Sequence, residues 1–178
     1  GYADLADMYE GIAKMDQILP AAREKVNAEL CDRFAALCQD HKFLYILGSG
    51  PVFSQAYGFA ICSLMEMQWQ SCAYIHSGEY FHGPFEVSTE GKPYVFFMSD
   101  GATRPMDARA LTFLKRMGAK VALIDSKDYG LADAVPASVV TYFNPLLHLA
   151  VMREYGNQIA EARQHPLTMR RYMWKLSY

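Results

Sequence analysis

Short apolar runs alternate with longer amphipathic stretches along the chain. Five runs are predicted to be strands, at residues 42–47, 71–75, 94–98, 121–124 and 138–141. Around them, apolar residues recur at intervals of three and four, which predicts helices at 3–15, 21–38, 52–68, 104–117 and 145–161. Short, continuously apolar strands that alternate with helices are typical of a buried parallel sheet. The pattern therefore predicts an α/β fold, with a parallel five-stranded sheet and helices on both faces.

Length and charge limit the classes of function. A chain of 178 residues is long enough for one domain with a sizeable core, and its formal net charge is −2. No basic stripe is present, so we expect no nucleic-acid partner. No apolar run approaches the roughly 18–20 residues that cross a bilayer, and we expect no membrane partner. The chain begins with glycine and not methionine, and we expect a further region upstream of it.

The cysteines are predicted to be free thiols. Cys31, Cys38, Cys62 and Cys72 form no Cys-x-x-Cys pair, and each lies among apolar residues. This usage fits buried thiols in a reducing compartment, so we predict a cytoplasmic protein.

Polar residues follow three of the predicted strands, where parallel sheets bind ligands. The turn Gly48-Ser49-Gly50 lies between a strand and a helix with Pro51 in its first turn. Its N–H groups would bind an anion, although a plain tight turn explains the residues as well. After the third predicted strand, residues 99–103 (Ser-Asp-Gly-Ala-Thr) offer hydroxyl groups, but Asp100 would repel a phosphate. We predict that this second segment caps the following helix.

The densest polar segment lies at residues 76–86. His76, Glu79 and His82 are three residues apart, a spacing that suits a metal site on a helix. Gly78 and the Gly-Pro pair at 83–84 disfavour a continuous helix, so we predict no metal there and no cofactor. His82 is instead expected at the edge of a turn. An imidazole there either transfers protons near neutral pH or is a structural histidine.

Two further features are candidates for chemistry. Glu66 ends the apolar helix that continues from Phe59, among methionines and near Trp69, where a partly desolvated carboxylate suits general-base catalysis. A solvated charge at a helix end is the alternative. The tail over residues 170–178 is basic and aromatic, and we expect it to pack against a cleft or another subunit.

Together these segments resemble one family, the sugar isomerase (SIS) domains. The resemblance covers nearly the whole chain. It rests on Gly-Glu-Tyr-Phe-His-Gly-Pro at residues 78–84, on Glu66 sixteen residues before His82, and on Lys175 four residues after Arg171. The pattern is similar to the second SIS domain of fructosamine-6-phosphate deglycases and of the isomerase part of glucosamine-6-phosphate synthase. It implies a flavodoxin-like three-layer sandwich.

The resemblance also implies an activity, closer to the deglycases than to the synthase. The expected substrate is a ketosamine 6-phosphate, and the products are glucose 6-phosphate and an amine. Catalytic roles are implied for Glu66, His82 and Lys175. Substrate binding is expected of a second group: Gly48, Ser49, Gly50, Glu79 and Arg171. The alternatives are an aldose–ketose phosphosugar isomerase, a non-catalytic module that binds a sugar phosphate, and a domain that serves dimerisation alone.

Members of this family carry two SIS domains, and the resemblance implies that residues 1–178 are one of them. We therefore expect the C-terminal half of a longer protein, whose missing N-terminal SIS domain grips the sugar phosphate. Residues 162–178 would be a tail that closes over the active site. A homodimer is expected, in which His82 reaches the site of the neighbouring subunit.

Overall fold

Four parallel strands form the centre of the computed structural model, which describes residues 2–29, 34, 36–37 and 42–177. The strands are β1 (Phe43–Gly48), β2 (Ser71–His76), β3 (Pro93–Met98) and β4 (Lys120–Asp125), in the order β2-β1-β3-β4. The longer helices are α1 (Leu5–Glu29), α4 (Arg104–Arg116) and α6 (Val140–Ala162). The shorter ones are η1 (Gly50–Val52), α3 (Phe53–Gly58), the π-helix η2 (Phe59–Met67), η3 (Tyr80–His82), η4 (Pro84–Val87), η5 (Ser126–Tyr129) and α5 (Leu131–Ala134).

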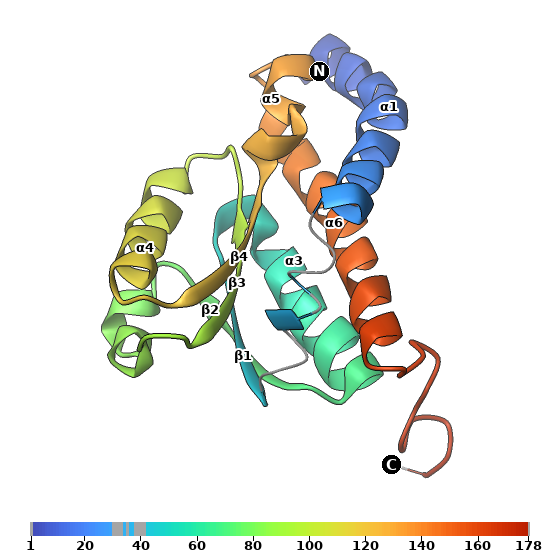
Figure 1. Ribbon diagram of the computed structural model, residues 1–178. Helices are drawn as coiled ribbons and strands as arrows, with labels where there is room; N and C mark the ends of the chain where they lie inside the picture. The colour runs from blue at the N-terminus through green and yellow to red at the C-terminus, as the bar shows by residue number, and fades with distance from the viewer. Residues whose placement is uncertain (1, 30–33, 35, 38–41, 178) are drawn as a thin grey trace.

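Helices cover both faces of the sheet, which confirms the predicted α/β fold with three layers, and the strand order matches the start of the flavodoxin-like order. Figure 1 shows α4 on one side and α3 and α6 on the other, with α1 packed outside α6. Neighbouring side chains of each strand point to opposite faces. In β3, for example, Val95 and Phe97 join the core under α3 and α6, whereas Phe96 joins the core under α4.

The predicted fifth strand at 138–141 is wrong, because these residues lead into α6. Val139, Phe143, Leu147 and Val151 are all buried and are four residues apart. This helical spacing places them on one stripe against the core, and it outweighs the β-branched character of residues 139–141.

The break predicted between two N-terminal helices is also wrong, since α1 continues through Pro20. Met15, Ala22 and Val26 form its buried stripe, and α1 packs along α6. The part of the second predicted helix at 30–33, 35 and 38 lies outside the described residues. Two predicted helix boundaries are confirmed. Pro51 lies in the first turn of η1, and Gly118 adopts a positive φ of 70° just after α4.

Candidate active site

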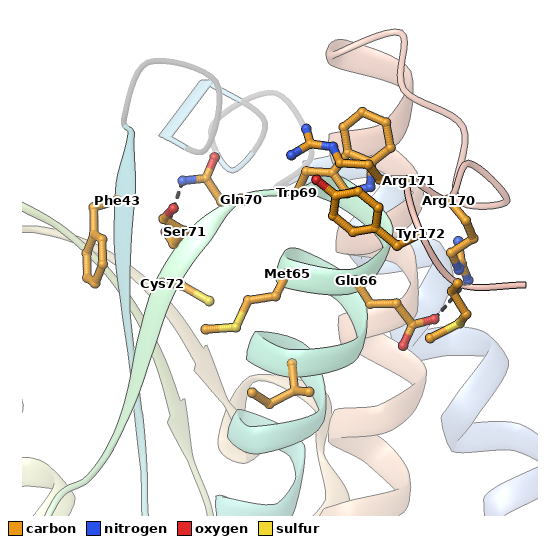
Figure 2. Close-up of a pocket in the computed structure, with 12 residues that line it drawn as sticks. Phe43, Met65, Glu66, Trp69, Gln70, Ser71, Cys72, Arg170, Arg171 and Tyr172 are labelled. Carbon is orange, nitrogen blue, oxygen red and sulfur yellow. Dashed lines mark hydrogen bonds and ion pairs between the residues drawn. The ribbon is translucent and has the colours of Figure 1, made fainter. Parts of the chain in front are cut away.

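A pocket of about 680 Å³ opens at the amino-terminal edge of the sheet, under the C-terminal tail. Its wall includes the first residue of β1, the first two residues of β2 and the end of η2 (Figure 2). Most of the lining is apolar, aromatic or sulfur-bearing. The lining residues are Phe43, Ile61, Met65, Glu66, Trp69, Gln70, Ser71, Cys72, Arg170, Arg171, Tyr172 and Met173.

Glu66 projects into this pocket from the last turn of η2. Its carboxylate forms an ion pair with Arg170, whose Nη2 lies 2.9 Å from Oε1 of Glu66 (Figure 2). The side chains of Glu66 and Arg170 are 26% and 10% exposed. The ion pair fixes the carboxylate of Glu66 at the wall of the pocket, and a carboxylate is a type of group that can act as a general base.

The tail reaches Glu66 because it docks on the short link between η2 and β2. Gln68 donates from Nε2 to the carbonyl of His165 at 2.8 Å, and Arg163 donates to the carbonyl of Gln68 at 3.0 Å. Trp69 then turns with a φ of 52°, and the His165 ring meets the indole edge-on at 4.5 Å. The guanidinium of Arg171 also packs against Trp69, with its central carbon 4.2 Å from the centroid of the indole ring.

Lys175 lies on the same tail but does not line the pocket. Its Nζ donates to the carbonyl of Arg170 at 2.6 Å, and the residue is exposed. The next residue towards the pocket, Trp174, is 80% exposed and has a φ of 60°. In this arrangement the ammonium group of Lys175 binds the backbone of the loop that presents Arg170.

The turn at residues 48–50 lies at the carboxyl-terminal edge of the sheet, far from the pocket. Gly50 has a φ of 53°, and a Cβ there would lie 2.4 Å from Oγ1 of Thr103. Ser49 is fully buried and donates to Oδ1 of Asp107 at 2.7 Å. The close packing and the carboxylate favour the tight-turn explanation of Gly48, Ser49 and Gly50 over anion binding.

The predicted capping role of residues 99–103 is wrong. Thr103 precedes α4, but its hydroxyl makes no capping hydrogen bond. The segment makes other hydrogen bonds. The Asp100 N–H donates to Oδ1 of Asn144 on α6, and the Gly101 N–H donates to Oγ of Ser99 within the segment. Contacts with α6 have therefore replaced the local cap.

His82 and Glu79 lie beyond the carboxyl-terminal end of β2, and both are exposed. The Glu79 N–H donates to the carbonyl of His76, and the His82 N–H donates to the carbonyl of Glu79, so they belong to one tight turn. Phe81, between them, packs under the guanidinium of Arg109 at 4.2 Å.

Glu66 and His82 therefore lie at opposite ends of the same strand. β2 has six residues, and a strand rises roughly 3.3 Å per residue, so the two groups are separated by about 20 Å within one chain. The structure places Glu66 and Arg171 on the wall of one pocket, and it leaves His82, Glu79 and the 48–50 turn at the other edge.

Sequence patterns missed Arg170 and Trp69 as parts of the pocket. Arg170 is adjacent to Arg171 in a basic, aromatic tail, and nothing in the pattern distinguishes the two arginines. The only available signal was the density of aromatic and basic residues at 170–178, which predicted packing but no partner.

The remaining predictions concern cysteines, metals and membranes. Cys62 and Cys72 are free thiols as predicted, but the predicted burial is wrong for Cys62, which is exposed. Burial raises the pKa of Cys72 to about 11, and Cys31 and Cys38 lie outside the described residues. Within the described ranges, no group of three His, Cys, Asp or Glu side chains is arranged to hold a metal ion. In the same part of the chain, no helix has both the length and the apolarity to span a membrane.

Curated proteins similar to the chain are deglycases. No protein-family model matches the chain. It is 40% identical over 169 residues to fructosamine deglycase FrlB of Bacillus subtilis (strain 168), across 95% of this chain and 51% of that protein. It is 33% identical over 89 residues to the fructoselysine 6-phosphate deglycase of Escherichia coli (strain K12), across 50% of this chain and 26% of that protein. The chain thus spans about half the length of the first of these relatives.

Solved structures extend the likeness. A protein from Salmonella typhimurium LT2 described as a phosphosugar isomerase superposes with a TM-score of 0.95 at 44% identity, covering 100% of this chain and 54% of that chain. One from Bacillus subtilis with the same description gives 0.94 at 38% identity, covering 99% and 53%. The C-terminal domain of a glucosamine-fructose-6-phosphate aminotransferase from Francisella tularensis shares the fold, with a TM-score of 0.73 at 17% identity, covering 89% and 45%. With these likenesses added to its own motifs, the chain belongs to the sugar isomerase (SIS) domain family.

Proposed function

We propose that this chain is the base-carrying half of a fructosamine-6-phosphate deglycase. The observation that carries the proposal is the position of Glu66, a carboxylate in a largely apolar pocket beneath a docked tail. The names of the relatives support a ketosamine 6-phosphate as substrate. A phosphosugar isomerase would use the same type of base, so the two activities differ in the substrate and in the final hydrolysis.

The proposed reaction moves two protons, one from C1 to C2 and one from the amine nitrogen to the oxygen on C2, and it adds one water. Glu66 takes a proton from C1 of the open-chain ketosamine, and the electron pair forms an enolamine between C1 and C2. Return of a proton to C2 gives an imine between C1 and the nitrogen. Water adds to C1, the C–N bond breaks, and glucose 6-phosphate and the free amine are released. The sum is substrate plus water, with no oxidant or reductant.

Arg170 limits how far the base can move. Besides its ion pair with Glu66, Arg170 donates from Nη1 to the carbonyls of Leu167 and Met169, at 2.6 and 2.9 Å. The tail and the carboxylate are therefore held by the same guanidinium. We propose that residues 162–178 close over the substrate, and that the ion pair orients Glu66 towards C1.

His82 requires a different arrangement, because it lies about one strand length from Glu66. We propose a homodimer in which His82 of one subunit serves the pocket of its partner, opening the sugar ring or moving protons at the sugar oxygens. Its exposed position on a tight turn supports this role. Glu79 would contact the substrate from the same turn.

The other proposed substrate contacts are those of Lys175 and of a phosphate site. Lys175 would need the Arg170 carbonyl bond to open before its amine could reach the sugar carbonyl. Among the lining residues of this pocket, only Ser71 and Tyr172 carry hydroxyl groups, which is fewer than the Ser/Thr-rich loop expected for a sugar phosphate. We therefore propose that an upstream SIS domain supplies the phosphate site.

A coupled assay for glucose 6-phosphate tests the function. The assay uses fructoselysine 6-phosphate with this chain and with the longest native protein that contains it. We expect release by the long protein, and little by the 178-residue chain, because substrate positioning contributes much of the rate. No release by either, together with conversion of fructose 6-phosphate, would replace the deglycase by an isomerase. No reaction with either substrate would leave a sugar-phosphate-binding module.

A further inference from the structure

Helices α1 and α6 carry apolar side chains on their outer surfaces as well as against the core. Their exposed fractions run from 37% for Leu149 to 66% for Tyr9. On each helix, three such residues are separated by intervals of four and three, so they form one stripe along the helix. We call the six residues the α1–α6 face: Leu5, Tyr9 and Ile12 on α1, and Tyr142, Leu146 and Leu149 on α6.

The two helices run parallel, which places their stripes side by side. Ser138 donates to the carboxylate of Asp7, and the two residues are 131 apart in the sequence. Arg23 forms an ion pair with Glu154 at 2.5 Å, and these two are also 131 apart. The constant offset shows that the end of the α1 stripe lies level with the start of the α6 stripe.

The stripes continue into a groove of about 750 Å³ along α6. Leu19 follows the α1 stripe at the same helical spacing, and it lines the groove together with Leu146 and Leu149. The opposite wall comes from η2, with Cys62 and Met67. Figure 1 shows the cause, since α6 lies between α1 and α3. An apolar groove between helices is a type of surface that binds an amphipathic helix.

The distribution of charge around the α1–α6 face is that of an interface. The next residues of the two stripes are Asp16 and Arg153, and both are exposed. The apolar part is thus bounded by polar groups, as the core of an interface is bounded by its rim. Single exposed hydrophobic side chains are ordinary on protein surfaces, whereas a contiguous apolar face marks a place where another surface packs.

The length of the relatives indicates what covers this face. The chain matches about half of each of the two-fold longer proteins most similar to it in fold and sequence that are described above. The proposed function assigns the other half to an upstream SIS domain. The side chains of Tyr2 and Tyr142 interact, so the start of α1 lies at the α1–α6 face. A domain that precedes α1 is tethered there, and a tether favours it over a separate chain.

Resting on the proposed function, we infer that the α1–α6 face is the docking surface of the upstream SIS domain, which lays an apolar helix in the groove along α6. The groove and the pocket of Glu66 share no lining residue, because they lie on different sides of η2. Docking therefore brings the upstream domain within one helix of the pocket and leaves the pocket open.

Hydroxyl-radical oxidation of the longest native protein that contains the chain, measured for each residue by mass spectrometry, tests the docking. Tyr9 and Tyr142 are 66% and 57% exposed in this chain, and Tyr57, on α3 outside the face, is 47% exposed. We expect Tyr9 and Tyr142 to oxidise at least about tenfold more slowly than Tyr57, because a covered side chain reacts only when its cover opens. Rates equal to that of Tyr57, or above it, would overturn the inference.

A charge placed in the face identifies the occupant. Leu146→Arg changes a side chain that is 45% exposed in this chain, so the domain itself should stay folded, as continued protection of the buried Tyr80 would verify. We expect Tyr9 to oxidise at least about fivefold faster in this variant, since an apolar interface does not accommodate an unpaired charge. The particle mass from light scattering should not change. Tyr57→Arg is the matched control and should alter neither quantity.

Two results with Leu146→Arg would contradict the inference. A particle mass that falls to half as Tyr9 becomes reactive would identify a second copy of the chain as the occupant. A Tyr9 that stays protected would show that its cover does not pack on Leu146.

Failure of the proposed function is a separate result, because neither measurement requires turnover. If no glucose 6-phosphate is released, the deglycase proposal fails, and the oxidation rates still decide the docking. If glucose 6-phosphate is released while Tyr9 and Tyr142 react freely, the deglycase remains and the docking inference fails.

Discussion

The two edges of the sheet use their polar side chains in opposite ways. At the amino-terminal edge, Glu66, Arg170 and Arg171 line an open pocket, and only one pair among them is neutralised. At the carboxyl-terminal edge, many polar groups are buried and several bind one another, but Glu79 and His82 are exposed and the buried Oγ1 of Thr103 has no hydrogen-bond partner among the described residues. Ligands of open α/β sheets usually bind at the carboxyl-terminal edge. In this chain, that edge combines an internal network with an exposed turn.

Two sets of hydrogen-bonded side chains hold part of the carboxyl-terminal edge together. Arg104 forms two hydrogen bonds with Asp125, at 2.8 and 2.6 Å. Burial raises the pKa of Asp125, but the bonds from Arg104 outweigh it and the net shift is downward. Asn144 accepts from the Asp100 N–H and from Ser126, and so joins the ends of β3 and β4.

The difference shows that strand ends alone do not identify a site. Polar residues at the carboxyl-terminal edge can form either a ligand site or an internal network. Sequence patterns distinguish these two cases poorly. What separates them is whether the side chains have partners within the fold. By that criterion the exposed turn at Glu79 and His82 is the part of this edge that is available to another subunit.

The sharpest test of the comparison is Glu66→Gln in the longest native protein. We expect kcat to fall at least about a hundredfold, because general-base catalysis contributes at least that much. The control is Glu90→Gln. Glu90 is exposed and belongs to neither of the two polar groups that the comparison concerns. Steady-state kinetics with fructoselysine 6-phosphate measure both variants, and a loss under threefold in Glu66→Gln would remove the base assignment.

Mixing subunits tests whether the edges cooperate between chains. Glu66→Gln and His82→Ala should each be nearly inactive alone, because each lacks one group of every site. Random mixing of two inactive subunits in a dimer should restore about a quarter of the wild-type activity, since half of the dimers then hold one complete site. Co-expressed, differently tagged subunits provide the measurement. Activity that stays at background would argue that His82 acts elsewhere.

Removing the cation of the carboxyl-terminal edge should affect stability and leave the chemistry intact. Arg104→Gln leaves Asp125 mostly buried without its partner, and we expect unfolding to require about 2–3 kcal/mol less free energy. Denaturant titration measures this loss. The kcat of the folded enzyme should be unchanged, and a tenfold fall in kcat would contradict a purely structural role.

The smallest expected effect depends on pH. Burial lowers the pKa of His148 to about 3, from the 6.5 of an imidazole in water. Between these values the unfolded chain binds a proton that the folded chain does not, so stability falls as pH decreases below 6.5. The loss should reach about 2 kcal/mol at pH 5.

His148→Gln should remove this component of the pH dependence, although it also loses the contact between Nε2 and Ser126 at 2.7 Å. The measurement is the free energy of unfolding at pH 7 and at pH 5 for both proteins. A wild type and a variant that lose equal stability over this range would show that another group is responsible.

Local patterns were sufficient for most of the fold. The four strands and the helices between them follow from apolar runs and from 3.6-residue spacing, with Pro51 and Gly118 at helix boundaries. The predicted strand at 138–141 failed because a short β-branched run outweighed the longer stripe through Phe143 and Leu147. Helix α1 was divided at Pro20 for a similar reason, since packing on α6 compensates for the local cost.

The chain's own sequence determined its family, its alternation of strands and helices and the identity of Glu66 and His82 as candidates, because each depends on residues close together in the sequence. Only the tertiary structure decided which groups meet. Glu66 and Arg170 are 104 residues apart, and Trp69 and Arg171 are 102 apart. Their contacts depend on where the tail docks, and that position follows from hydrogen bonds to Gln68 that no local pattern encodes.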